Sequence, residues 1–305
     1  MAVPDLSVSF AGLKLKTPVL LASGTCGYGE ELGAHFDLAR LGGIVVKSLT
    51  REPRAGNAPQ RIAETAGGML NAIGLQNVGV EAFMRDHLPR LAALDLPVLC
   101  NVAGATMEEY ETVCRMLGDA RGVAGIELNV SCPNVSCGGM EFGVDPALTE
   151  EVTGRARRAY KGPLLVKLSP NVTDIAAIAK AAERGGADGL SLINTVLGMA
   201  IDAERRKPVL SNGFGGLSGP AIKPVALRCI WQVAAAVNLP ILGMGGIRTG
   251  EDAVEFLLAG ATAVAVGTAN FLDPQAALTV TAGLGDWLAG HGVGAVRDLV
   301  GGARA

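Results

Sequence analysis

A polar loop with a thiol follows an apolar segment near the middle of the chain. The segment Gly125–Val130 is apolar, and Cys132 follows it between Asn129 and Asn134. In α/β enzymes the chemistry lies at the carboxyl ends of buried strands. The three histidines are at 35, 87 and 291, and we expect none of them at a strand end. Cys132 is therefore the strongest candidate for an acid–base residue.

Most free cysteines are inert, buried side chains. We expect this of Cys26, Cys100, Cys114 and Cys229. Cys132 differs because its surroundings are polar. An ordinary thiol has a pKa of about 8.5, so a cysteine base favours alkaline pH unless its pKa is lowered.

Two lysines, Lys47 and Lys167, end apolar segments. Lysine is rarely buried unless it is paired. One interpretation is an internal ion pair or a side chain that reaches solvent. The other is a fixed positive charge facing a substrate carboxylate or the electron-rich pyrimidine edge of a flavin. Two such lysines at equivalent strand ends favour the second interpretation.

Several asparagines lie at the ends of predicted strands or in the loops that follow them. They are Asn71, Asn101, Asn129, Asn134 and Asn194. Each amide offers two donors and an acceptor. A single asparagine at a strand end is usually a turn former. Several together suit a ring with alternating N–H and C=O groups, such as a pyrimidinedione or an isoalloxazine.

Glycine turns follow the last two apolar segments, at Gly245-Gly246 and Gly267-Thr268. Backbone N–H groups in such turns bind phosphate at the mouth of a barrel. Ser218-Gly219-Pro220 is typical of another helix start. The alternative is tight turns that need glycine for their geometry. Two turns at the expected strands favour phosphate binding.

Eight apolar segments must position these residues. They are Val19–Ala22, Gly43–Ser48, Val98–Val102, Gly125–Val130, Leu164–Ser169, Gly189–Asn194, Ile241–Met244 and Ala263–Gly267. Their nearly continuous apolar character indicates parallel strands buried on both faces. Helical patterns lie between them, at Val80–Leu94, Met107–Gly118, Thr149–Tyr160, Ile175–Arg184, Ala221–Val237, Gly250–Ala259 and Pro274–Ala289.

Eight strands in alternation with helices predict an α/β fold, the (β/α)8 TIM barrel. An open, doubly wound sheet is the alternative, but no G-x-G-x-x-G motif follows the first strand. Ser7–Phe10 and Leu13–Lys16 predict a short hairpin under the barrel. Thr50–Gly79 and Leu197–Gly219 are predicted as long inserted loops, which are usually functional. Without a linker or repeat, we expect one domain over residues 1–305.

The composition excludes several classes of protein. Hydrophobic residues make up 49% of the chain and charged ones 18%, which excludes disorder. A net charge of −3 without a basic tract argues against nucleic acid. No apolar run is long enough for a membrane span, and no secretion signal is visible. The six cysteines form no C-x-x-C pair, so we expect no metal on this chain and a cytoplasmic location.

The motifs together resemble dihydroorotate dehydrogenase over nearly the whole chain. They are Val45–Ser48, Asn71–Asn77, Glu127–Asn134, Val166–Pro170, Ile193–Thr195, Gly215–Gly219 and Gly243–Ile247. The resemblance implies an FMN enzyme that oxidises (S)-dihydroorotate to orotate in pyrimidine biosynthesis.

The form of the enzyme is implied by further details. A cysteine base and the absence of an N-terminal membrane helix resemble the soluble class 1 enzymes. Cys132–Gly143 and Thr195–Asp202 are similar to the NAD-linked type B form. In that form a partner subunit carries FAD and a [2Fe-2S] iron–sulfur cluster and passes electrons to NAD+. The resemblance also implies a homodimer core within a heterotetramer.

The resemblance assigns roles residue by residue. Cys132 is implied to remove the proton from C5 of the substrate, while hydride leaves C6 for flavin N5. The implied substrate-binding residues are Lys47, Asn71, Ala72, Ile73, Gly74, Leu75, Asn129, Asn134, Asn194 and Thr195. The implied FMN-binding residues are Ser23, Lys47, Ser48, Asn101, Asn129, Lys167, Ile193, Gly219, Gly245, Gly246, Gly267 and Thr268.

Three questions stay open at this point. Cys137 departs from the family pattern, and is either a bystander or the partner of Cys132 in an inactivating disulfide. The substrate is either dihydroorotate or another dihydropyrimidine, as in the related domain of dihydropyrimidine dehydrogenase. A non-catalytic phosphate-binding barrel that serves as a scaffold is the alternative outside enzymes.

Overall fold

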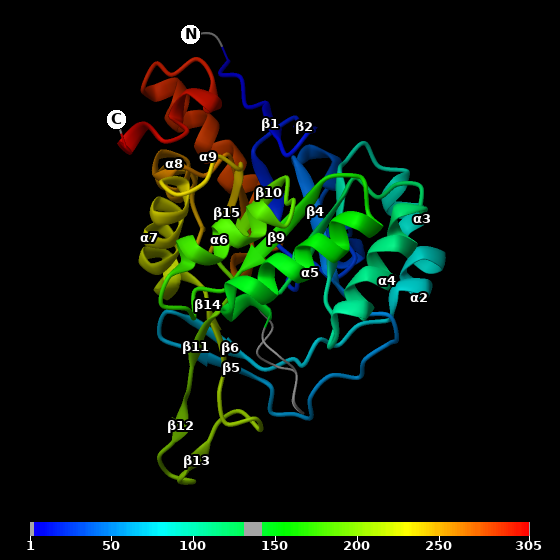
Figure 1. Ribbon diagram of the computed structural model, residues 1–305. Helices are drawn as coiled ribbons and strands as arrows, with labels where there is room; N and C mark the ends of the chain where they lie inside the picture. The colour runs from blue at the N-terminus through cyan, green and yellow to red at the C-terminus, as the bar shows by residue number, and fades with distance from the viewer. Residues whose placement is uncertain (1–2, 131–141, 305) are drawn as a thin grey trace.

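The eight apolar segments form a closed parallel barrel, as predicted (Figure 1). The computed structural model describes residues 3–130 and 142–304. The barrel strands are β3 (Val19–Leu21), β4 (Gly43–Leu49), β7 (Val98–Val102), β8 (Gly125–Asn129), β9 (Leu164–Leu168), β10 (Gly189–Leu192), β15 (Ile241–Met244) and β16 (Ala263–Val266). Because β16 pairs in parallel with β3, the sheet has no open edge and the doubly wound alternative is wrong.

Helices surround this barrel. They are α2 (Val80–Asp86), α3 (Leu88–Ala92), α4 (Met107–Gly118), α5 (Pro146–Ala159), α6 (Ile175–Arg184), α7 (Lys223–Ala234), α8 (Gly250–Ala259) and α9 (Ala276–Gly290). The predicted bounds of α4, α6 and α8 are confirmed. Helix α5 begins three residues earlier than predicted, because Asp145 accepts a hydrogen bond from the Leu148 N–H and Pro146 suits the first turn.

The predicted helix Val80–Leu94 is wrong in one respect, because it is two helices. It breaks at His87, between α2 and α3. Pro89 lacks an N–H group and cannot donate to the carbonyl group of Arg85, so an unbroken helix would lose a hydrogen bond there. Similarly, the predicted helix Ala221–Val237 begins with a 3₁₀ turn, η3 (Pro220–Ile222), and ends at Ala234.

The connection between β3 and β4 holds only short helical pieces, so the predicted strict alternation is incomplete. They are α1 (Glu30–Gly33) and the 3₁₀ turn η1 (Leu38–Arg40). Gly29 precedes α1 with φ +88°, in the left-handed region that favours glycine. Further 3₁₀ turns are η2 (Phe142–Val144), η4 (Thr268–Phe271), η5 (Val296–Leu299) and η6 (Gly302–Arg304).

The predicted N-terminal hairpin is confirmed as β1 (Val8–Phe10) and β2 (Leu13–Leu15). Ala11 and Gly12 both have positive φ, as the two central residues of a type I′ turn require. A Cβ atom built on Gly189, at the start of β10, would lie 3.3 Å from the Ala11 Cβ atom. The hairpin therefore covers the amino-terminal end of the barrel strands.

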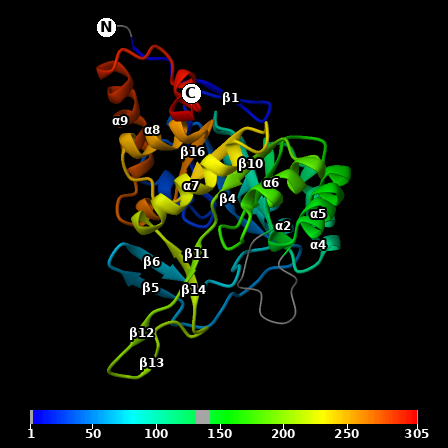
Figure 2. The same cartoon turned by 60° about the vertical axis from the view of Figure 1, so that its left-hand side comes forward.

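The two inserted segments are not plain loops, which corrects the prediction. They contain β5 (Ile62–Thr65), β6 (Gly68–Asn71), β11 (Val196–Gly198), β12 (Ile201–Asp202), β13 (Lys207–Pro208) and β14 (Gly215–Ser218). Four of these strands form one antiparallel sheet in the order β11-β14-β6-β5. Figures 1 and 2 show this sheet at the end of the molecule opposite the hairpin, with β12 and β13 projecting beyond it.

The barrel interior is apolar except near this end. Buried polar side chains in its strands are Asn101, Glu127, Asn129, Lys167 and Ser191. Polar groups buried between apolar strands need hydrogen-bond partners, so this end of the barrel interior marks the candidate site. In residues 3–130 and 142–304, no helix is long and apolar enough to cross a lipid bilayer.

Candidate active site

Four polar side chains from four different strands or strand ends meet inside the barrel. The Asn101 amide donates to Glu127 Oε1 at 2.5 Å, and the Ser23 hydroxyl donates to the same oxygen at 3.3 Å. The Lys167 ammonium donates to Ser23 Oγ at 3.1 Å and lies 3.8 Å from Glu127 Oε1. We call Ser23, Asn101, Glu127 and Lys167 the polar layer.

The register of the barrel brings this layer together. Asn101 on β7 pairs with Glu127 on β8, and Asn129 on β8 pairs with Lys167 on β9. Since side chains along a strand alternate between its two faces, Glu127 and Asn129 both point toward the barrel interior. Ser23 lies just after β3 and reaches the same space.

Glu127 is the member that our sequence reasoning missed. It lies within a motif that carries the family resemblance, but no role was predicted for it. The signal was present, because Glu127 is a charged residue inside an otherwise apolar strand. Its side chain is fully buried, which is rare for a carboxylate without a cation beside it.

A second polar group lies beside this layer. The Asn194 amide donates to Asn129 Oδ1 at 3.2 Å, and Asn194 Oδ1 accepts from the Thr195 N–H at 2.8 Å. The Tyr110 hydroxyl donates to the Asn129 carbonyl at 2.6 Å. These contacts orient both amides at the carboxyl ends of β8 and β10, where two of the predicted substrate-binding asparagines are brought together.

Lys47 and Ser48 lie at the carboxyl end of β4, where the strand is irregular. The pairing of β4 with β7 shifts register between Val46 and Leu49. A bulge of this kind redirects side chains at a barrel rim. Both residues are partly buried, and the Lys47 N–H donates to the Gly27 carbonyl. Ile193, after β10, is buried and donates its N–H to the Met244 carbonyl.

Cys26 lies close enough to Lys47 and Lys167 for both positive charges to affect the pKa of its thiol. Burial, and to a smaller extent the Glu31 carboxylate, raise the pKa of this thiol to about 12, and the two lysines offset this rise only in part. Cys26 is therefore a protonated thiol at neutral pH. Cys100, Cys114 and Cys229 are also buried free thiols, as predicted, and burial raises the pKa of each.

The segment Asn71–Leu75 continues from β6 on the antiparallel sheet. The Asn71 amide donates to the Gly216 carbonyl on β14 at 3.3 Å. Asn57, which our sequence reasoning also missed, donates its amide to the Ala72 carbonyl and its N–H to the Ile73 carbonyl. Gly74 and Leu75 then turn with positive φ. The segment is thus held both by β14 of the sheet and by Asn57 in the loop before β5.

Three glycine turns come together beside the polar layer. The Thr268 hydroxyl donates to Ser218 Oγ at 2.8 Å, which joins the turn after β16 to Gly219. A Cβ atom built on Gly246 would lie 3.0 Å from the Gly219 carbonyl oxygen. One built on Gly245 would lie 3.3 Å from Ile193. Gly219, Gly245 and Gly246 all have positive φ, so these turns use conformations that favour glycine.

Comparison with known proteins identifies the family. A family model described as dihydroorotate dehydrogenase matches residues 5–288. The chain belongs to the dihydroorotate dehydrogenase family. This membership makes it an oxidoreductase and confirms the resemblance seen in its motifs.

Curated relatives in this family are similar over their full length. A protein of Geotalea daltonii, named dihydroorotate dehydrogenase B (NAD(+)), catalytic subunit, is 56% identical and covers 99% of both chains. Proteins with the same name from Geobacter sp. strain M21 and Desulforudis audaxviator are 55% and 56% identical, covering 99% and 97% of this chain. They confirm the resemblance to the type B form.

A solved structure of the family shows the same fold. The DHODH of Eimeria tenella, in complex with ferulenol, superposes with a TM-score of 0.81. The superposed region covers 98% of this chain and 89% of the Eimeria chain, at 24% sequence identity.

Three predicted residues, Cys132, Asn134 and Cys137, lie outside the described residues. Within the part that is described, no group of three or more His, Cys, Asp or Glu side chains could hold a metal ion. The described part of the site therefore consists of amides, hydroxyl groups, lysines and one carboxylate.

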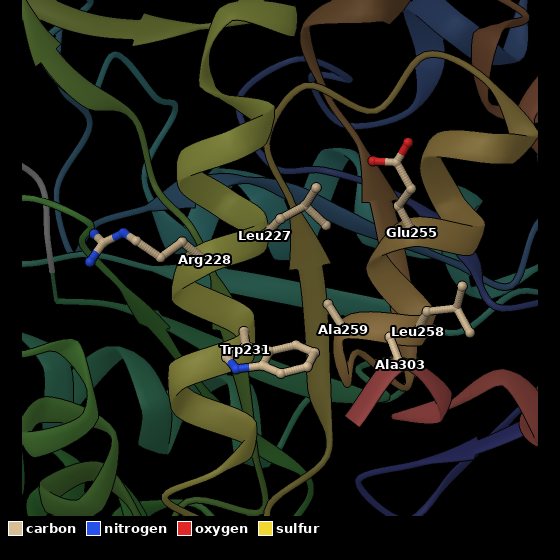
Figure 3. Close-up of a pocket in the computed structure, with 7 residues that line it drawn as sticks. All are labelled: Leu227, Arg228, Trp231, Glu255, Leu258, Ala259 and Ala303. Carbon is tan, nitrogen blue, oxygen red and sulfur yellow. The ribbon is translucent and has the colours of Figure 1, made fainter. Parts of the chain in front are cut away.

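Two surface hollows lie apart from the polar layer. One, of about 410 Å³, lies on the outer wall between α7, α8 and the C-terminal turn and is lined mainly by Leu227, Trp231 and Leu258 (Figure 3). The other, of about 540 Å³, lies between the loop Pro170–Asp174 and the start of α5. The first is apolar, and neither hollow is lined by a residue of the polar layer, which remains the candidate site.

Proposed function

We propose that this chain is the catalytic subunit of an NAD+-linked dihydroorotate dehydrogenase, which oxidises (S)-dihydroorotate to orotate in pyrimidine biosynthesis. The observation that carries this is the buried polar layer beside the Asn129–Asn194 pair and the three glycine turns. A chain more than half identical to enzymes of that name has this set of groups at one end of its barrel.

The residues present fit FMN. Asn101 Oδ1 is buried and has no hydrogen-bond partner in the described structure, so it is available to an N–H donor. Lys167 and Lys47 supply positive charge, and Ser23, Ser48, Asn129 and Ile193 complete the proposed flavin site. Gly219, Gly245, Gly246, Gly267 and Thr268 would hold the phosphate through backbone N–H groups. When bound, FMN supplies the acceptor for the hydride that leaves C6 of dihydroorotate.

The chain's own residues would perform the other steps. Cys132 would take the proton from C5 of the substrate as general base. Asn71, Asn129, Asn134 and Asn194, with Thr195, would hold the pyrimidine ring and its carboxylate. Lys47 and the segment Ala72 to Leu75 would complete this pocket. The Asn194–Asn129 hydrogen bond supports this part of the proposal, because it fixes the directions of two amides before substrate binds.

Electrons would leave through a second protein. The relatives are named catalytic subunits, which supports a partner subunit, and we propose that it carries FAD and a [2Fe-2S] iron–sulfur cluster. We further propose a homodimer core, a single domain over residues 1–305 and a cytoplasmic location. Four buried free thiols support that location.

Co-purification tests this proposal. The chain is expected to be yellow with bound FMN, to reduce its flavin with dihydroorotate, and to reduce NAD+ only weakly until the flavin–iron partner is added. A colourless chain that takes up no FMN would point to the scaffold alternative. A strong preference for dihydrouracil would overturn the substrate, and rapid NAD+ reduction by the chain alone would overturn the type B assignment.

A further inference from the structure

Glu127 is the one member of the polar layer to which the function proposed above assigns no role. Its side chain has no exposed surface, and it lies one layer deeper in the barrel than Asn129. A carboxylate in such a place is stable only with a cation and hydrogen-bond donors around it. Its neighbours are residues assigned to the flavin, so its charge lies directly behind the proposed flavin site.

The two oxygens of Glu127 have different surroundings. Oε1 accepts from the Asn101 amide and the Ser23 hydroxyl and faces the Lys167 ammonium at 3.8 Å. Oε2 is buried and has no hydrogen-bond partner in the described structure. Ser23 links the two charges, because it donates to Glu127 and accepts from Lys167. The carboxylate therefore lies close enough to Lys167 to cancel part of its charge.

We propose that Glu127 lowers the reduction potential of the bound flavin by offsetting the positive charge of Lys167. This inference rests on the proposed function, in which Lys167 faces the flavin. A cation beside a flavin stabilises the negative charge that the ring system gains on reduction, and so raises its potential. An anion 3.8 Å from that cation opposes the effect, and does so strongly because both charges are buried.

The direction of the effect suits the proposed acceptor. NAD+ is a weak oxidant, so a flavin that held its electrons too firmly would not pass them on. A barrel with two lysines at its mouth and no compensating anion would have such a flavin. Glu127 would act as a positioning and tuning residue, since it acts through Lys167.

The test is a redox titration of the FMN in the complex with its partner subunit, for wild type and Glu127→Gln. Glutamine can still accept from Asn101 and Ser23 but has no charge. At a fixed solution potential, the ratio of reduced to oxidised FMN is expected to rise about tenfold, which is about 30 mV for two electrons. An unchanged ratio in a variant that still binds FMN and oxidises dihydroorotate would overturn the inference.

A matched control removes a carboxylate elsewhere. Glu109 accepts from the Ala105 N–H and lies 3.5 Å from Arg54, outside the polar layer. Glu109→Gln changes the net charge equally. Its ratio of reduced to oxidised FMN is expected to stay within about twofold of wild type, because Glu109 is partly exposed and paired with Arg54, so solvent screens its charge. An equal rise in both variants would show an effect of net charge and would also overturn the inference.

A double variant decides the question if Glu127→Gln does not fold. Glu127→Gln with Lys167→Met removes both charges, which avoids leaving a single buried ion. In this double variant the ratio of reduced to oxidised FMN is expected to stay within about threefold of wild type, since the two opposite charges that were removed had cancelled each other. A fall of about tenfold would show that Lys167 acts without compensation. A wild-type protein that binds no FMN or does not oxidise dihydroorotate would instead contradict the proposed function.

Discussion

The Lys223 ammonium lies 2.7 Å from Asp252 Oδ1, and this ion pair joins two of the glycine turns. Lys223 begins α7, shortly after Gly219. Asp252 Oδ2 accepts from the N–H groups of Arg248 and Thr249, in the connection that follows Gly246. The pair therefore fixes the residues after Gly219 against the residues after Gly246, where we place the FMN phosphate.

Replacing Asp252 by asparagine is expected to weaken FMN binding about tenfold, because the amide cannot form the charged pair with Lys223. Fluorescence titration of the apoprotein with FMN measures this. Glu150→Gln, which breaks a surface pair with Arg184, is the control and should leave FMN affinity unchanged. Equal FMN affinity in Asp252→Asn and wild type would contradict the role of the pair.

Asp252 is also expected to make the free energy of unfolding depend on pH. Burial opposes ionisation of Asp252, but hydrogen bonds from Lys223, Arg248 and Thr249 outweigh this effect and lower its pKa below that of an ordinary aspartate. Because the pKa of Asp252 is lower in the folded than in the unfolded protein, its ionised carboxylate stabilises the fold at pH values above the unfolded-state pKa. This stabilisation is lost as the pH falls through the folded-state pKa. Urea unfolding below about pH 4 should show this loss in wild type and a smaller one in Asp252→Asn.

Gly246→Ala is expected to lose FMN. Gly246 has φ +90°, and an added Cβ atom would lie 2.8 Å from the Lys223 Cβ atom. Strain of this kind costs about 1 to 3 kcal/mol, so the turn would shift and FMN affinity should fall at least about tenfold. The control is Gly290→Ala, where a Cβ atom meets nothing within 4 Å. Flavin content after purification, read from visible absorbance, would be unaltered in Gly246→Ala if the turn does not bind phosphate.

Cys132→Ser is expected to slow flavin reduction by dihydroorotate about 10²- to 10⁴-fold, as for loss of a matched general base. Stopped-flow absorbance of the flavin measures this step. The wild-type rate should rise with pH as the thiol ionises. Cys26→Ser is the control, since that thiol has a pKa of about 12 and stays protonated. Near-normal reduction in Cys132→Ser would place the base elsewhere.

Asn194→Ala is expected to lower kcat/KM for dihydroorotate by at least about tenfold. The substitution removes a predicted substrate contact and also the donor to Asn129 Oδ1 at 3.2 Å. Steady-state kinetics with saturating acceptor measure the effect. The control is Asn238→Ala on the exposed surface. If Asn194→Ala changed only the thermal stability and left kcat/KM unchanged, Asn194 would stabilise the fold and would not bind substrate.

The amino-acid sequence by itself determined the barrel and the positions of most candidate residues. Burial on both faces of a parallel strand requires a continuous apolar run, so eight such runs could be counted directly. The ends of those runs then showed where Lys47, Asn129 and Lys167 would lie. The break at His87 was also readable, because Pro89 removes a backbone donor, although our prediction overlooked it.

Only the tertiary structure decided how distant segments pair. Strands β6 (Gly-Met-Leu-Asn) and β14 (Gly-Gly-Leu-Ser) contain glycine and no β-branched residue, so neither shows a strand pattern by itself. The hydrogen bond from Asn71 to Gly216 joins residues 145 positions apart. The partners of Glu127 depend on the register between β7, β8 and β9 and on the end of β3. No local pattern encodes that register, because it follows from closing the barrel, and only the closed barrel brings Ser23 and Lys167 to the same carboxylate.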